Sequence, residues 1–149
     1  MFARDLAEPY PSIGMDDAAL EAAHAMARDH LPGIVVCEPD GRPTRILPGS
    51  EVLRFAIPPY VQDDEGLARV IGQRGVERLM GQLHGRTVRE LLPEHPQGAL
   101  AMCGPEDTLL EVAVVMARTH SPLVAVVEHD RLVGCVTLPR LLDALLALA

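Results

Sequence analysis

The sequence predicts an α/β (α+β) fold built from two pseudo-symmetric units, each a small three-stranded sheet with two helices, packed sheet to sheet. The first observation is a duplication: residues 14–40 and 104–130 match at an offset of 90, with 13 of 27 positions identical. The second is the local pattern, because each copy has a helical run followed by two short β-branched runs. One unit alone would leave a sheet face uncovered, whereas two units packed together bury both faces.

A helix is expected in each copy, over residues 18–30 and 108–120, where apolar residues recur at helical spacing. Asp17 and Asp107 belong to the residue types that cap helix N-termini, and Thr108 begins a capping-box pattern. Prolines and histidines mark the ends of both helices: His30, Pro32, His120 and Pro122. These histidines either interact with the negative helix end or contact a ligand.

Strands and a closing helix follow in the same order in both copies. The expected strands are residues 12–13, 34–37 and 43–47 in the first copy and 101–103, 124–127 and 131–136 in the second. The closing helices are expected at residues 50–57 and 138–146. The sequence thus divides into a first repeat at 1–57, a helical insert or linker at 58–85 that is punctuated by glycines, and a second repeat at 86–149.

Composition narrows the class of function. The chain has 149 residues, 48% of them hydrophobic and 3% aromatic, which allows an aliphatic core and excludes a disordered segment. Its net charge is −8 and all 13 basic residues are arginines, which argues against nucleic acid and anionic membranes as partners. Neither a signal peptide nor an apolar run of membrane-spanning length is visible, so we expect a soluble, cytoplasmic protein without membrane insertion.

The three cysteines are expected to act as small buried hydrophobes. Cys37, Cys103 and Cys135 show no metal-ligand spacing. Their counterparts in the other copy are all aliphatic: Val127, Ile13 and Ile46. We therefore expect neither a metal site nor redox chemistry at these positions.

Several short motifs occur in a fixed order. The second copy contains TVRELL (87–92), GPEDTLLEVAVVM (104–116) and RLVGCVT (131–137), and the first contains ARDL (3–6) and DDAALEAAHAM (16–26). This order resembles the CBS domain in its usual tandem pair. The resemblance implies a regulatory module that binds adenosine-type ligands, such as AMP, in clefts between the copies and often dimerises through its helices.

The resemblance also suggests a ligand site. In the family, the cleft uses the first strand, the groups just before the second strand, and a Thr/Ser-x-x-Asp at the end of the third. Here the matching candidate residues are Ser12, Ile13, Gly33 and Glu51 in the first copy, and Met102, Pro122, Leu123, Ala125, Thr137 and Arg140 in the second.

The Thr/Ser-x-x-Asp pattern is incomplete in both copies. Thr137 keeps the hydroxyl, but Arg140, a donor without an acceptor, stands where the carboxylate is usual. In the first copy Pro48 replaces the hydroxyl and Glu51 holds the carboxylate position. Arg45 stands at the position of Gly134 and would crowd a ligand. A ligand should therefore prefer the second copy.

Two functions remain open from the sequence. The first is a stand-alone sensor of an AMP-like ligand that transmits binding through the geometry of a homodimer to an unknown effector protein. The alternative is a ligand-free scaffold for dimerisation or docking of a partner enzyme or transporter. We expect no enzymatic activity, no catalytic residues and no required cofactor, because none of the common catalytic or phosphate-binding motifs is present.

Overall fold

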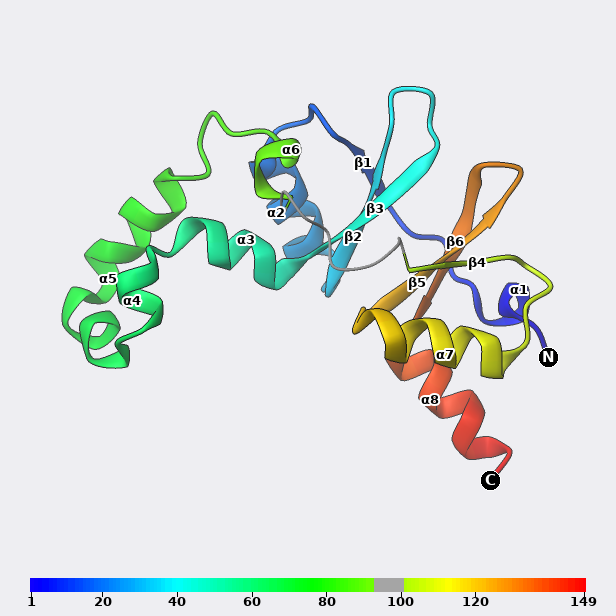
Figure 1. Ribbon diagram of the computed structural model, residues 1–149. Helices are drawn as coiled ribbons and strands as arrows, with labels where there is room; N and C mark the ends of the chain where they lie inside the picture. Colours follow the sequence, from blue (N-terminus) through cyan, green and yellow to red (C-terminus); the bar gives the residue numbers. More distant parts are fainter. Residues whose placement is uncertain (93–100) are drawn as a thin grey trace.

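The structure is a computed structural model that describes residues 1–92 and 101–149. Part of the second predicted repeat, residues 93–100, lies outside the described residues. The first repeat comprises β1 (Ser12–Gly14), α2 (Ala19–Arg28), β2 (Gly33–Cys37), β3 (Pro43–Pro48) and α3 (Gly49–Ala56). The second comprises β4 (Met102–Cys103), α7 (Leu109–Thr119), β5 (Leu123–Glu128), β6 (Arg131–Thr137) and α8 (Leu138–Ala147). Figure 1 shows the two units side by side.

The two sheets have the same topology, as the duplication predicts. The first has the order β1-β2-β3 and the second β4-β5-β6, with the first pair of strands parallel and the second pair antiparallel. Each sheet also has a register shift at the same place in its middle strand, after Val36 and after Val126. The predicted fold class is therefore confirmed, and the two sheets also share this irregularity in register.

The middle strands are buried on both faces because their side chains alternate between two cores. Ile34 and Val36 face α2 and α3 in the core of the first repeat. Val35, one residue out of phase, lies instead in a central cluster with Leu123 and Ala125 of β5. This central cluster, formed from both sheets, is the predicted sheet-to-sheet packing.

The starts of the two long helices differ from the expectation. The N-cap of α7 is Thr108, whose side chain forms the predicted capping box with Glu111. However, Asp107 does not cap the helix: its carboxylate accepts a hydrogen bond from the Gly104 amide at 2.9 Å. Asp17 does the same with Gly14 at 2.7 Å. Both aspartates therefore close the turn that leads from the first strand toward the helix.

The ends of the same helices are set by histidine. His30 and His120 have φ values of 54° and 52°, in the left-handed region that ends helices. Histidine is among the residue types enriched in this region. The chain can thus leave the helix and turn directly into the middle strand in both repeats.

The short helix that precedes each repeat, here called its lead-in helix, packs against the core of the other repeat. The short helix α1 (Ala3–Leu6) buries Ala3 and Leu6 in the core of the second repeat. The equivalent helix α6 (Val88–Leu91) buries Val88 and Leu91 in the core of the first repeat. The resemblance assigned ARDL to the first copy and TVRELL to the second. The structure places each against the opposite core, where its apolar residues are buried.

The segment between the repeats is helical and lies away from both sheets (Figure 1). It contains α4 (Pro59–Gln62) and α5 (Glu65–Gly81), which is interrupted at Gly72, where φ is 61°. None of the helices in the described residues is long and apolar enough to cross a membrane.

Candidate functional site

In the second repeat, the predicted site residues meet where β5 begins and β6 ends. Thr137 pairs in register with Leu123, and Met102 pairs with Ala125. The carbonyl of Pro122 accepts a hydrogen bond from the amide of the first α8 residue at 3.1 Å. Thr137 is the N-cap of α8, but its hydroxyl does not cap the helix.

The predicted residues of the first repeat have the same placement. Ser12 lies in β1 opposite Val35 of β2, and Gly33 pairs with Pro48 at the end of β3. Ile13 is buried in the core of the first repeat, so only its backbone can face a ligand. The strand ends of both repeats thus place Ser12 and Gly33 in the same way as Met102 and Leu123.

A carboxylate that the sequence did not indicate lies beside Arg140. Glu8 follows α1, and its Oε1 is 3.5 Å from Nε of Arg140. The backbone of Glu8 exchanges two hydrogen bonds of 2.9 Å with Cys135 on β6. In the second repeat a carboxylate from the N-terminal segment therefore lies beside Arg140, because α1 packs against this repeat.

Gly134 makes this approach of the N-terminal segment to β6 feasible. A Cβ at Gly134 would lie 2.5 Å from the carbonyl oxygen of Glu8. The first repeat has Arg45 at this position. The glycine in the strand-end motif therefore accommodates the protein's own backbone.

In the first repeat, Tyr10 lies against the start of β2. Its hydroxyl donates a hydrogen bond of 2.7 Å to the carbonyl of Gly33, and its ring packs against the central cluster. Burial raises the pKa of the Tyr10 phenol, so the hydroxyl stays protonated as the donor. Sequence reasoning missed this residue, although its place just before β1 and the rarity of tyrosine in the chain were available signals.

Glu51, the predicted acceptor of the first repeat, faces a different surface. Its carboxylate lies 3.5 Å from Arg54, and both line a hollow of about 600 Å³ between the end of α3 and α6. Glu51 is therefore paired with an arginine of its own helix, α3.

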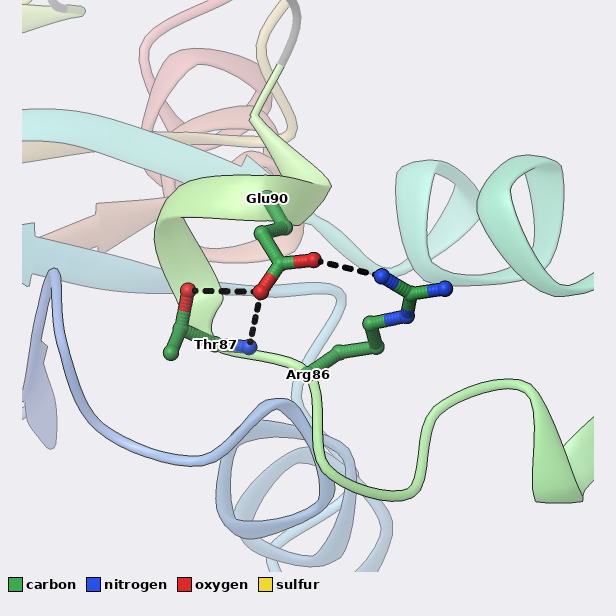
Figure 2. Close-up of polar contacts among 3 residues, drawn as sticks. All are labelled: Arg86, Thr87 and Glu90. Carbon is green, nitrogen blue, oxygen red and sulfur yellow. Dashed lines mark hydrogen bonds and ion pairs between the residues drawn. The ribbon is translucent and has the colours of Figure 1, made fainter.

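Glu90 of α6, which lines this hollow, belongs to the polar network shown in Figure 2. The Glu90 carboxylate accepts hydrogen bonds from Arg86 at 3.0 Å and from the Thr87 amide at 3.3 Å. The Arg86 bond, followed by the Thr87 amide, lowers the pKa of Glu90. Arg86 also lies over the ring of Phe55, 5.8 Å from its centroid. Arg86 therefore connects Glu90 of α6 to Phe55 of α3.

A second hollow, of about 530 Å³, lies between α7 and α8. Its lining is mostly apolar and includes Met116, Ala117, Leu141 and Leu145. We call it the α7–α8 groove.

The cysteines behave as the sequence predicts. All three are buried. Desolvation by burial raises the pKa of Cys103 and of Cys135 to about 12, so these thiols stay protonated at neutral pH. Within the described residues, no group of three or more His, Cys, Asp or Glu side chains is placed to hold a metal ion.

Comparison with known proteins identifies this architecture. The sequence profile of the CBS domain matches residues 88–147. A CBS domain-containing protein of unknown function from Kribbella flavida is 43% identical, over 98% of this chain and 99% of its own, with a TM-score of 0.82. The chain belongs to the CBS-domain family. Its two repeats form a tandem CBS pair, as the motif order suggested.

Other structures share the CBS-pair fold. The CBS domain of a CBS domain containing membrane protein from Sphaerobacter thermophilus is 27% identical, over 96% of this chain and 86% of its own, with a TM-score of 0.72. CBSX2, a CBS-pair protein of Arabidopsis thaliana, has been solved in complex with AMP. In that complex it is 16% identical, over 99% of this chain and 97% of its own, with a TM-score of 0.68. No significant match was found among curated proteins.

Proposed function

We propose that this CBS pair is a cytoplasmic, non-catalytic regulatory module that senses an adenosine-type ligand, AMP foremost, in the cleft of its second repeat. The observation that carries the proposal is the Arg140–Glu8 ion pair, whose arginine lies three residues after Thr137, the N-cap of α8. A hydroxyl and a guanidinium can contact a phosphate, and a carboxylate can accept from two ribose hydroxyls. The AMP complex of CBSX2 supports the ligand class.

The ligand state reaches an effector protein through a homodimer in this proposal. Symmetric dimers are the commonest oligomers, and the helices of the second repeat expose a large apolar surface. Neither nucleic acid nor a membrane is a proposed partner, since the chain carries a net charge of −8.

Calorimetry with adenosine, AMP, ADP and ATP tests the proposal directly. We expect AMP to bind, and ATP to bind no more than a few fold tighter than AMP. The positions before the middle strands are Pro32, Gly33, Pro122 and Leu123, none of which can neutralise added phosphates. Arg140 is the only arginine among the predicted site residues, and one guanidinium makes at most a bidentate pair with a phosphate. ATP binding at least tenfold tighter, a gap of about 1.4 kcal/mol, would contradict this expectation.

The two repeats should contribute unequally to binding. Thr137→Val removes the hydroxyl that does not cap α8, and we expect it to weaken AMP binding by about 0.5–1.5 kcal/mol. Glu51→Gln should have a smaller effect, because Glu51 is paired with Arg54 and Tyr10 covers Gly33 in that repeat. Titration of both variants, with circular dichroism to confirm folding, checks this order. The reverse order would assign the site to the first repeat.

A ligand-free scaffold is the second candidate function. It is favoured by Tyr10, which fills part of the first repeat, and by the apolar α7–α8 groove, which is suited to a protein partner. If the protein is dimeric but no adenosine compound changes its unfolding temperature, the result supports the ligand-free scaffold.

A further inference from the structure

The ring of Tyr10 lies beside the central cluster that joins the two repeats. Its hydroxyl donates a hydrogen bond of 2.7 Å to the carbonyl of Gly33, the first residue of β2. The ring packs against this cluster, whose members come from both sheets and include Val35 and Leu123. The phenol therefore occupies space at the start of β2, although Tyr10 itself belongs to neither sheet.

The chain on either side of Tyr10 holds this ring in place. Tyr10 stands between two prolines in the sequence EPYP (8–11), and a proline restricts both its own φ and the conformation of the residue before it. Two residues earlier, the backbone of Glu8 exchanges two hydrogen bonds with Cys135 of the second repeat. Two residues later, Ser12 pairs with β2 of the first repeat. The ring is thus positioned by contacts with both repeats.

The second repeat differs from the first at the equivalent place. This place is the start of β5, where Leu123 matches Gly33 and pairs with Thr137 of the proposed ligand site. The carbonyl of Leu123 accepts a hydrogen bond of 2.6 Å from the hydroxyl of Ser121, a side chain without a ring. The sequence of the second repeat, residues 86–149, contains no Phe, Tyr or Trp. An aromatic side chain is therefore present at this place in the first repeat, whereas the second repeat supplies none of its own.

We infer that Tyr10 is a built-in occupant of the first repeat, which limits the chain to one adenosine-type ligand. The inference rests on the proposed function, because the ligand place of the second repeat is the reference for the first. Truncation of Tyr10 would leave a space with apolar walls and an unpaired carbonyl at Gly33. Apolar cavities made by truncation can take up a planar ring. Adenine also carries an amine that can donate to the carbonyl, which is costly to leave unpaired.

Counting bound adenosine tests the inference. Adenosine is the probe because Pro32 and Gly33, which precede and begin β2, cannot neutralise a phosphate. At saturation in equilibrium dialysis, Tyr10→Ala should bind one more adenosine per chain than the wild type. Tyr60→Ala truncates a tyrosine on α4 that is 64% exposed, so it should bind the same number as the wild type. If Tyr10→Ala is folded by circular dichroism but binds no more adenosine than the wild type, the inference is wrong.

Two further arms show whether the additional adenosine takes the place of the ring. Tyr10→Phe keeps the ring and loses only the hydroxyl, so it should bind the wild-type number. Since p-cresol has the structure of a tyrosine side chain, it should displace the additional adenosine from Tyr10→Ala. An additional adenosine that binds to Tyr10→Phe, or that persists in saturating p-cresol, would overturn the inference.

Nitration of the wild type provides a test that does not depend on the folding of Tyr10→Ala. Tetranitromethane reacts with phenolates, and burial raises the pKa of Tyr10. Peptide mass spectrometry should show Tyr60 nitrated and Tyr10 protected, both with and without saturating adenosine. Nitration of Tyr10 that begins when adenosine is added would mean that the ligand displaces the ring, which contradicts a built-in occupant.

The outcomes separate this inference from the proposed function. If the wild type binds neither AMP nor adenosine and Tyr10→Ala binds one adenosine, the proposed site of the second repeat fails and the role of Tyr10 stands. If both proteins bind one adenosine, the role of Tyr10 fails and the proposed site stands. A wild type that binds two adenosines per chain rules out Tyr10 as an occupant.

Discussion

Replacing Leu123 by alanine is expected to lower the free energy of unfolding by about 2–5 kcal/mol. Leu123 is fully buried at the start of β5, in the central cluster shared by the two sheets. One of its methyl carbons would lie 3.4 Å from a Cβ added at Gly33, so it fills the space directly between the repeats. The truncation should leave a cavity at this contact. Urea unfolding at a fixed protein concentration measures the loss.

Leu53→Ala is the matched control for this change. Leu53 is a leucine on α3 that is 56% exposed, so its truncation should change the unfolding free energy by no more than about 0.5 kcal/mol. If the two variants have similar stability, the contact between the repeats does not support the fold as the structure indicates.

Gly134→Ala is expected to detach the N-terminal segment from the second repeat. The added methyl group would lie 2.5 Å from the carbonyl oxygen of Glu8, closer than a carbon and an oxygen can approach. Either β6 or the Glu8 backbone must move, and the two hydrogen bonds between Glu8 and Cys135 are then lost. Overpacking of this kind costs about 1–3 kcal/mol. Hydrogen exchange of residues 3–8 and urea unfolding should both report it.

Gly104→Ala provides the matched substitution. There the nearest atom to an added Cβ is 3.6 Å away, on the side chain of Asp107, which is ordinary contact. We expect little change in stability and full protection of the N-terminal segment. If that segment is also protected in Gly134→Ala, the two hydrogen bonds between Glu8 and Cys135 do not require a glycine at position 134.

Much of the fold could be predicted because each copy supplied an internal control for the other. The aliphatic counterparts of the cysteines predicted burial, and Cys37, Cys103 and Cys135 are buried. The hydroxyl of Thr108 and the acid at Glu111 predicted a capping box that the structure contains. Such inferences succeed because they depend on contacts within a few residues.

The candidate site could be predicted only in part, because its remaining residues depend on long-range packing. Nothing local to Glu8 or Tyr10 shows that they lie against Cys135 and Gly33. The apolar residues of ARDL carry no local signal of which core they enter. Asp17 was also misread, since an aspartate before a helix can close the preceding turn as readily as it caps the helix.

The exchange of lead-in helices also determines the order in which the chain can fold during synthesis. The first repeat cannot complete its core until α6 has been made, after the whole of the α4–α5 segment. Helix α1 finds its core only after α7 and β6 have been made. Each half therefore depends on the other to complete its core. A ribosome that stalls between the repeats would leave the core of the first repeat and the apolar residues of α1 exposed to chaperones or aggregation.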